Sequence, residues 1–148
     1  MEKIYTALGL MTGTSLDGID GSIIRSDGEK NINIERNEYY KYRDHFRDQL
    51  QDFIKACNDR EYIKKNYKIY SELEKKLTLH HVEISNKILL SYGSKIDLIG
   101  FHGQTIIHKP KQGYSIQMGD AHLLSKILKQ KVIYQFRKKD IENKGEGA

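Results

Sequence analysis

Residues 9–20, GLMTGTSLDGID, combine the residue types that bind phosphate. The residues with this chemistry are Gly13, Thr14, Ser15, Asp17 and Gly18. The two glycines let main-chain N–H groups approach an anionic ligand closely, and the two hydroxyls add hydrogen-bond donors. The aspartate does not attract phosphate itself, but a carboxylate beside bound phosphates suits a hydrated Mg²⁺ ion. The pattern predicts a phosphate-binding turn.

The alternative for the same residues is an ordinary hairpin turn in which Ser15 and Asp17 cap backbone groups. The stretch is not a Walker motif, because no Gly-Lys-Ser or Gly-Lys-Thr follows, and it lacks the glycine spacing of a dinucleotide-binding fold. Strand-like segments flank it at residues 4–8 and 21–24. Both interpretations place the chemistry in the bend of a β-hairpin.

A second polar cluster, His102-Gly103-Gln104-Thr105, follows the apolar segment 96–101. The segment is typical of a short buried strand, and open α/β sheets bind ligands at the carboxyl ends of such strands. His102 and Gln104 are therefore candidates for contacts with the hydroxyls or carboxylate of a ligand. The alternative is a turn in which His102 satisfies backbone groups.

Charged residues mark two further candidate positions. Asp120 precedes a predicted helix at residues 121–128, where it suits the N-cap position. A cap is compatible with a ligand contact, because a helix N-terminus also favours an anionic group. A predicted strand at residues 132–136 leads into Arg137-Lys138-Lys139-Asp140, whose cations either clamp a phosphate or carboxylate or form a solvated basic turn.

The elements that must position these residues follow an α/β pattern. Three strands are expected before any helix, at residues 4–8, 19–25 and 32–40. Two helical patterns follow between residues 43 and 92, with a polar break at Asn58-Asp59-Arg60 and a C-cap at Gly93. A further strand is expected at residues 114–118, directly before Gly119.

His80, His81 and Cys57 lie in the helical region. Adjacent residues of a helix point about a hundred degrees apart, so the two histidines predict a solvent-facing helix surface rather than a metal site. Cys57 stands alone, which excludes an intramolecular disulfide, and its apolar neighbours predict a small buried residue rather than a nucleophile.

Length and charge bound the function classes. The 148 residues suffice for one domain with a hydrophobic core. The 25 Lys and Arg residues are spread along the chain and nearly matched by 20 Asp and Glu residues, for a net charge of +5, so nucleic acid is not an expected partner. No stretch is long and apolar enough for a membrane span or a signal peptide, and the expected location is cytoplasmic.

Four segments carry a family resemblance: residues 9–20, 99–105, 117–120 and 136–141. In this order they resemble signatures of the anhydro-N-acetylmuramic acid kinases, sugar kinases of the actin-like ATPase superfamily. One glycine-rich turn is a weak match, but four ordered matches are specific. The resemblance implies an α/β, ribonuclease-H-like domain over residues 1–148. Its mixed sheet opens with an antiparallel hairpin, and helices pack on the sheet.

The resemblance implies ATP-dependent conversion of 1,6-anhydro-N-acetylmuramic acid to N-acetylmuramic acid 6-phosphate in peptidoglycan recycling, with ATP and Mg²⁺ as cofactors. It implies cofactor contacts from Gly13, Thr14, Ser15, Leu16, Asp17, Gly18, Ile19 and Asp20. The metal is expected to bind Asp17 through water. The implied substrate contacts come from His102, Gln104, Thr105, Asp120, Arg137 and Asp140.

Family members are more than twice as long as this chain, so the resemblance implies the N-terminal part of a two-domain kinase. The second domain and the catalytic aspartate base are expected beyond Ala148, and no catalytic residue is expected within the chain. The expected partners are a small sugar and either a separate C-terminal half or a homodimer; the alternative is a non-catalytic remnant. Gln135 replaces the family's usual aspartate, and Lys138 and Lys139 replace arginines, which removes the bidentate fork that recognises carboxylates.

Overall fold

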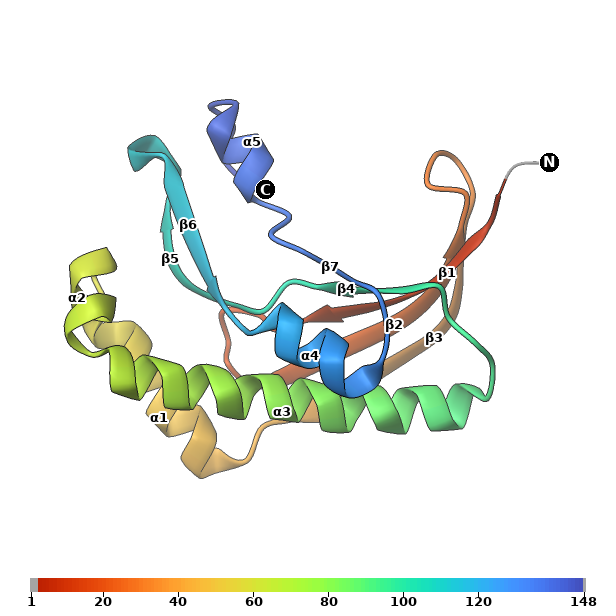
Figure 1. Ribbon diagram of the computed structural model, residues 1–148, viewed down its shortest axis with the longest axis horizontal. Coiled ribbons are helices and arrows are strands. Elements are labelled where there is room, and N and C mark those ends of the chain that lie inside the picture. The colour runs from red at the N-terminus through yellow and green to blue at the C-terminus, as the bar shows by residue number, and fades with distance from the viewer. Residues whose placement is uncertain (1–2, 148) are drawn as a thin grey trace.

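A mixed β-sheet lies at the centre of the computed structural model, which describes residues 3–147 (Figure 1). Its strands, in the order β3-β2-β1-β4-β7, are β3 (Ile32–Lys41), β2 (Gly18–Ser26), β1 (Tyr5–Met11), β4 (Leu98–Phe101) and β7 (Val132–Tyr134). β2 pairs antiparallel with both β1 and β3, whereas β4 pairs parallel with both β1 and β7. The predicted opening of three antiparallel strands is confirmed, as is the ribonuclease-H-like, actin-like fold class.

Helices lie on one side of this sheet (Figure 1). They are α1 (Asp44–Ala56), α2 (Arg60–Lys65), α3 (Tyr67–Tyr92) and α4 (Ala121–Leu128). The predicted break separates α1 from α2, where the Asp59 side chain caps α2 by accepting from the Tyr62 N–H. α3 ends at Gly93, whose left-handed φ of 72° confirms the predicted C-cap. α4 and its N-cap Asp120 are also confirmed.

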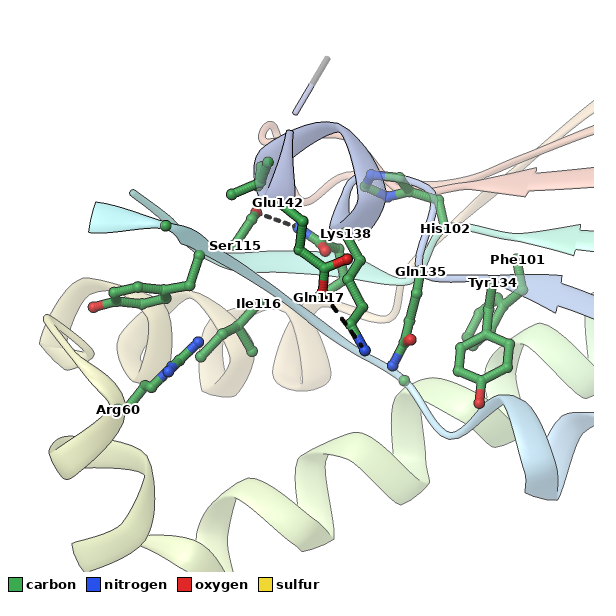
Figure 2. Close-up of a pocket in the computed structure, with 14 residues that line it drawn as sticks. Arg60, Phe101, His102, Ser115, Ile116, Gln117, Tyr134, Gln135, Lys138 and Glu142 are labelled. Carbon is green, nitrogen blue, oxygen red and sulfur yellow. Dashed lines mark hydrogen bonds and ion pairs between the residues drawn. The ribbon is translucent and has the colours of Figure 1, made fainter. Parts of the chain in front are cut away.

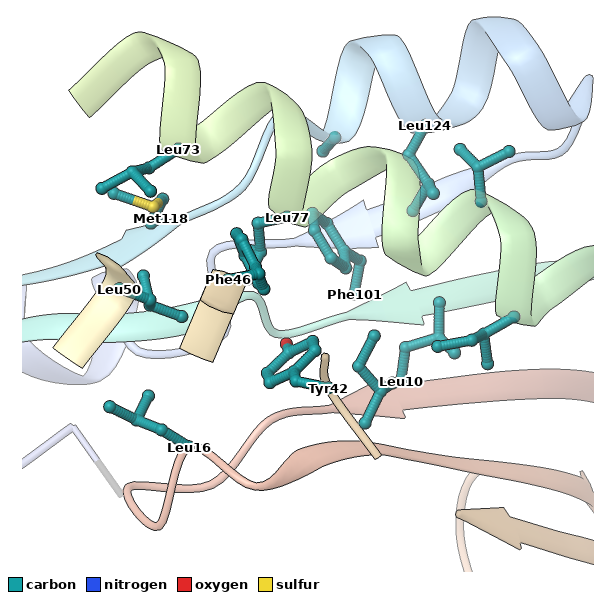
Figure 3. Close-up of a cluster of buried hydrophobic side chains, with 14 of the residues drawn as sticks. Leu10, Leu16, Tyr42, Phe46, Leu50, Leu73, Leu77, Phe101, Met118 and Leu124 are labelled. Carbon is teal, nitrogen blue, oxygen red and sulfur yellow. The ribbon is translucent and has the colours of Figure 1, made fainter. Parts of the chain in front are cut away.

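The hydrophobic core lies between the sheet and the helices (Figure 3). Alternate residues of the central strands point into it, as the two-residue period of a strand requires. Its fully buried members include Leu8, Ile19, Ile23, Leu77, Ile88, Ile99 and Leu124. Burial of each such side chain contributes about 1.5–3 kcal/mol to stability. The core therefore fixes the register of β1 against β2, and with it the two ends of the loop that joins them.

A two-stranded antiparallel sheet follows β4 in the chain. It consists of β5 (Gln104–Lys109) and β6 (Tyr114–Met118), joined by a 3-10 turn at Pro110–Gln112. β6 matches the predicted strand, but the sequence analysis predicts no strand at β5. The pairing register shifts between Thr105 and Ile107, and the adjacent residues Ile106 and Ile107 are both buried. The irregularity removes the alternation by which a strand is recognised.

The C-terminal segment differs from its prediction. β7 ends at Tyr134, two residues earlier than expected, because Gln135 adopts a left-handed φ of 61°. The basic residues that follow begin a short helix, α5 (Lys138–Glu142), instead of a turn. α5 lies beside the β5–β6 hairpin, on the side of the sheet away from α3 (Figure 1).

The prediction that His81 faces solvent is wrong. The side chain is fully buried, its Nδ1 donates to the Leu77 carbonyl at 2.8 Å, and its ring packs edge-on against Phe101 with centroids 4.9 Å apart. Burial lowers the pKa of His81 to about 4, so the imidazole is neutral at physiological pH. The neighbouring His80 is partly buried. Cys57 is buried at the C-cap of α1, as predicted.

Candidate functional site

The loop between β1 and β2, residues 12–17, exposes polar side chains and buries an apolar one. Thr14, Ser15 and Asp17 are exposed, whereas Leu16 packs into the core. Leu16 has a left-handed φ of 55°, which is uncommon for a residue other than glycine. Burial of its side chain holds this conformation. The polar residues are thereby fixed on a turn whose backbone is anchored in the core.

Asp17 presents an ionised carboxylate on this loop. The Ser15 hydroxyl donates a hydrogen bond to Asp17 Oδ1, and this bond lowers the pKa of Asp17. The Asp17 main-chain carbonyl accepts from the Tyr42 N–H at 2.8 Å, which ties the loop to the residue after β3. The Ser15 contact is the one expected for an ordinary capped turn. The Asp17 carboxylate nevertheless remains exposed, and it is the kind of anionic oxygen ligand that a hydrated Mg²⁺ ion prefers.

The last residues of the predicted cofactor motif belong to β2. Gly18 is required by strand packing, because an added Cβ would lie 2.2 Å from the main-chain oxygen of Tyr40. Ile19 is fully buried in the core. Asp20 is exposed and pairs with Met11 and Tyr39 across the sheet. The exposed ligand groups of the motif therefore come from the loop and from Asp20 near the start of β2, whereas Gly18 and Ile19 position them.

The turn after β4, residues 102–104, is hydrogen-bonded to the β1–β2 loop. Thr12 Oγ1 donates to the Gly103 carbonyl at 3.0 Å, and Gln104 Nε2 donates to the Gly13 carbonyl at 3.3 Å. Gly103 has a φ of 70°, and an added Cβ would lie 2.4 Å from the Met118 main-chain oxygen, so this position requires glycine. The structure thus brings together the two polar clusters that are 91 residues apart in the sequence.

His102 connects this turn to the C-terminal segment. Its Nε2 accepts from Arg137 Nε at 3.0 Å, so Nδ1 carries the proton and donates to the Gly103 carbonyl at 2.7 Å. Partial burial lowers the pKa of His102, and the nearby guanidinium acts in the same direction. Arg137 also donates from Nη1 to the Gly147 carbonyl at 2.5 Å. His102 is a neutral imidazole held from both sides, and Arg137 bonds within the protein.

The other predicted substrate residues also make internal contacts. Asp140 Oδ2 accepts from Gly147 N (2.6 Å), Asp120 Oδ1 from Leu123 N (2.9 Å), and Thr105 Oγ1 from Gln117 Nε2 (3.3 Å). Gln104 is buried behind the loop. Of the six residues predicted to contact substrate, His102 is the one that lines the pocket at this end of the sheet.

That pocket has a volume of about 310 Å³ and lies between β6, α5 and the end of β4 (Figure 2). Its lining includes Arg60, Phe101, His102, Ile116, Gln117, Tyr134, Gln135, Lys138 and Glu142. The Arg60 guanidinium lies 4.2 Å from the ring centroid of Tyr114, and Lys138 Nζ lies 4.0 Å from Glu142. The pocket combines two cations, the carboxylate of Glu142, side-chain amides and apolar walls, so its lining has a net positive charge that suits a small polar anion.

Most of this lining is not among the residues predicted from the sequence to contact a ligand. Gln117 lies in one of the segments that carry the family resemblance, and Gln135 and Lys138 are departures from the family pattern, so signals existed for these three. Arg60 had none, because α2 and β6 are distant in the sequence and meet only in the fold.

Residues 3–147 contain neither a clustered metal site nor a membrane-spanning helix. No three His, Cys, Asp or Glu side chains there gather as a metal-binding group. A Mg²⁺ ion does not require such a group, because it is commonly held by one or two carboxylates, water and substrate phosphates. None of the helices in this range has both the length and the apolar character needed to cross a membrane.

Comparison with known proteins agrees with the motifs. The family model for anhydro-N-acetylmuramic acid kinase matches residues 5–148. The anhydro-N-acetylmuramic acid kinase of Pelagibacter ubique is 46% identical over 148 residues, which cover 100% of this chain and 40% of that protein. The proteins of the same name from Rhodopseudomonas palustris and Rhizobium johnstonii are 34% and 37% identical; the matches cover 97% and 100% of this chain, and 40% and 41% of the relatives.

The chain thus spans about 40% of the length of these curated relatives and corresponds to their N-terminal part. Because the family model covers nearly all of the sequence, and the fold agrees with it, the chain belongs to the anhydro-N-acetylmuramic acid kinase family.

Proposed function

We propose that this chain forms the N-terminal part of a kinase that phosphorylates 1,6-anhydro-N-acetylmuramic acid, with ATP as phosphoryl donor. The observation that carries the proposal is the turn of residues 102–104. On one side it holds the β1–β2 loop, through Thr12 and Gly13, and on the other its His102 lines the pocket. A phosphate-binding loop and an acceptor pocket are thereby held by one short, hydrogen-bonded segment, which is the arrangement that phosphoryl transfer requires.

The β1–β2 loop is the proposed nucleotide side. Thr14 is an exposed hydroxyl donor, Ser15 holds the Asp17 carboxylate through its own hydroxyl, and Gly13 lets the main chain approach phosphate oxygens. Asp17, whose carboxyl pKa is lowered, is the proposed metal-side ligand and acts through water. A bound Mg²⁺ ion would neutralise charge on the phosphates. The residues present fit this role, because they offer one ionised oxygen ligand on a loop and no enclosing cage.

The pocket of Figure 2 is the proposed sugar side. Gln135 offers amide hydrogen bonds for the sugar hydroxyls and the acetamido group, and Gln117, whose Nε2 donates to Thr105 and Ser115, offers its Oε1 as an acceptor. Lys138 and Arg60 are the cations available to the lactyl carboxylate. Its volume of about 310 Å³ lies near the lower end of the range for small-ligand sites, about 300–1,000 Å³. The His102 imidazole is neutral and both of its ring nitrogens are hydrogen-bonded within the protein, so it forms part of the pocket wall and adds no charge.

The proposed reaction opens the anhydro ring and transfers one phosphoryl group. Water adds to the anomeric carbon as the bond from that carbon to O6 breaks, O6 takes the γ-phosphoryl group, and ADP leaves. The proton lost by the water needs a general base. We assign that base to the part of the family polypeptide that this chain does not span, together with the second wall of the cleft that excludes water. The reaction is expected in the cytoplasm, where ATP is available.

The test is an assay for ADP release and sugar 6-phosphate formation with Mg-ATP and anhydro-N-acetylmuramic acid. The chain is assayed alone and co-expressed with the C-terminal part of the Pelagibacter ubique relative. We expect turnover in the co-expressed pair, and a KM raised at least tenfold for 1,6-anhydro-N-acetylglucosamine, which lacks the lactyl carboxylate. Equal KM values for the two sugars would contradict the assignment of Lys138 and Arg60. A folded, assembled pair without turnover would contradict the kinase proposal.

A further inference from the structure

Gln104 is a buried amide at the start of β5, and its neighbours determine how the amide is oriented. Its Nε2 donates to the carbonyls of Gly13 (3.3 Å) and Thr105 (3.4 Å). An exchanged amide would place Oε1 against these two carbonyl oxygens, so the hydrogen-bond network fixes the position of the nitrogen. Because Gln104 is 1% exposed, it holds the Gly13 carbonyl toward the interior of the protein.

The Gly13 carbonyl determines the direction of the next main-chain N–H. The carbonyl and the N–H of a trans peptide point in opposite directions. The Gly13 carbonyl points toward the buried Gln104, so the Thr14 N–H points toward the exposed side of the β1–β2 loop. The Leu16 N–H donates to the same carbonyl at 3.3 Å and closes the turn. Gln104 thus turns a main-chain donor toward the proposed nucleotide side.

Two buried polar atoms near this turn are complementary. Within residues 3–147, neither Gln104 Oε1 nor the Tyr42 hydroxyl has a hydrogen-bond partner. The amide oxygen is an acceptor, and the hydroxyl can donate. Tyr42 is 3% exposed and lies beside Phe46 in the core (Figure 3), with ring centroids 5.2 Å apart. Buried polar groups in native proteins are nearly always paired, so both atoms call for a partner.

Both side chains lie close to Thr12. The Thr12 hydroxyl donates to the carbonyl of Gly103, the residue before Gln104, at 3.0 Å. Burial raises the pKa of Tyr42, and the nearby Thr12 hydroxyl acts in the opposite direction. The Tyr42 N–H donates to the Asp17 carbonyl at 2.8 Å. Tyr42 therefore lies against both ends of the β1–β2 loop.

We propose that Gln104 and Tyr42 are positioning residues for the phosphate donor of the β1–β2 loop. When phosphate binds to the Thr14 N–H, the Tyr42 hydroxyl donates to Gln104 Oε1 and fixes the amide that holds the Gly13 carbonyl. Neither side chain touches the ligand, and both act through the peptide between Gly13 and Thr14. Gln104 thereby has a role other than the substrate contact expected from the sequence. The inference rests on the proposed function, because it requires nucleotide phosphates at this loop.

Isothermal titration calorimetry with Mg-ATP tests the proposal in the co-expressed pair of chains. Tyr42→Phe removes only the hydroxyl, so we expect it to raise the Kd for Mg-ATP by about three- to tenfold, the effect of one hydrogen bond. The control is Tyr70→Phe on α3, because Tyr70 also packs against the core but its hydroxyl donates to Glu74 at 3.1 Å. The control should leave the Kd for Mg-ATP unchanged. Both variants should keep the affinity for anhydro-N-acetylmuramic acid.

A double variant tests whether the hydroxyl acts through Gln104. Gln104→Met keeps a side chain of similar size without the polar amide, and it should raise the Kd for Mg-ATP more than Tyr42→Phe does. Adding Tyr42→Phe to Gln104→Met should raise the Kd no further, because the hydroxyl has lost its acceptor. Additive effects of the two substitutions would overturn the proposal.

If Gln104→Met does not fold, NMR spectra that resolve individual amides decide. The Thr14 amide proton should shift downfield when Mg-ATP is added, and it should shift less in Tyr42→Phe than in Tyr70→Phe. Equal shifts in the two variants would overturn the proposal.

The outcome in the unsubstituted pair separates this inference from the proposed function. If that pair binds no Mg-ATP, the proposed function fails and the positioning roles fail with it. If that pair binds Mg-ATP and Tyr42→Phe binds it with the same Kd, only the positioning roles fail.

Discussion

The β1–β2 loop and the C-terminal segment, residues 135–147, contain similar polar residue types but use them differently. In the loop, the core side chain of Leu16 holds the backbone, and Thr14 and Asp17 face solvent. In the C-terminal segment, Arg137 and Asp140 bond to the main chain of the same segment. Both regions bury an apolar side chain, Leu16 in the loop and Ile141 in the C-terminal segment. The difference is that the loop leaves Thr14 and Asp17 facing solvent, whereas Arg137 and Asp140 hydrogen-bond to the backbone of their own segment.

Gly103→Ala should have the largest effect, because the Gly103 carbonyl accepts from both Thr12 and His102 and so connects the two regions. The left-handed φ costs alanine about 1–2 kcal/mol, and the added Cβ would lie 2.4 Å from the Met118 main-chain oxygen. We expect a total loss of about 3–4 kcal/mol of unfolding free energy in urea. The matched control is Gly28→Ala, with a φ of 80° and no atom within 4 Å of the added Cβ, which should lose about 1 kcal/mol. Similar losses in both variants would mean that Gly103 does not join the regions.

Acid should destabilise the core and the C-terminal segment before it changes the charge of the loop. The pKa of buried His81 falls from 6.5 to about 4, so the unfolded chain binds a proton that the folded chain does not. Stability should be constant above pH 6.5 and fall by about 3 kcal/mol as the pH drops to 4. His102, whose pKa is also lowered, acts in the same direction, because protonation removes the acceptor for Arg137.

Urea unfolding at pH 7.5, 6, 5 and 4.5 measures this slope. His81→Leu should remove most of the dependence of the unfolding free energy on pH. His102→Asn should remove a smaller part of it. Asp17, with a lowered pKa, stays ionised through most of this range. A slope that His81→Leu does not reduce would show that the buried imidazole is not the source.

The features that could be predicted from the sequence are those with local causes. Gly93 and Asp120 end and begin helices through their own backbone and side-chain chemistry, and β1 and β2 flank a turn whose glycines are visible in the sequence. Features that depend on distant contacts could not be predicted. His81 is buried because it packs against Phe101, and Arg60 reaches the pocket because α2 lies near β6.

The candidate site divides in the same way. The hydrogen bond between Ser15 and Asp17 could be predicted from their types, because the two residues are close in the chain. The type of Arg137 predicts a ligand contact with equal force, yet its partners are His102 and the carbonyl of Gly147. Residue type alone does not reveal whether a charged group is already paired within the fold.

Asp17→Asn should weaken binding of Mg-ATP by about 10- to 100-fold, which corresponds to about 1.4–2.7 kcal/mol, while unfolding free energy changes by less than about 0.5 kcal/mol. The carboxylate is exposed, so its charge contributes little to the fold. Isothermal titration calorimetry with Mg-ATP measures the affinity, in the co-expressed pair of chains if the chain alone binds too weakly. The comparison variant is Asp20→Asn, the other exposed carboxylate of the predicted cofactor motif, which lies on β2 and not on the loop. Equal loss of affinity in both variants would mean that both carboxylates serve the cofactor and would remove the distinction between loop and strand.

Asp140→Ala should have the smallest effect. Unlike Asp17→Asn, it should lower the unfolding free energy and leave nucleotide affinity unchanged. Its Oδ2 accepts from the N–H of Gly147, a buried residue, at 2.6 Å, and loss of that acceptor leaves the N–H without its partner. We expect a loss of about 1 kcal/mol of unfolding free energy, after a small gain from the helix propensity of alanine in α5. Nucleotide affinity should be unchanged. Lys139→Ala, at the neighbouring exposed position, is the control that measures the stabilisation from the helix propensity of alanine alone.

Asp140→Asn then separates the two roles that a carboxylate can have at this position. The asparagine Oδ1 can still accept from Gly147, so a residue that only holds the backbone should recover most of the stability lost in Asp140→Ala. A residue that recognises substrate through its charge would not be rescued, because asparagine is neutral. If Asp140→Asn is as stable as the unmodified chain but raises the KM for sugar in the co-expressed pair, the C-terminal segment binds ligand as well as holding itself, and the contrast with the loop is one of degree.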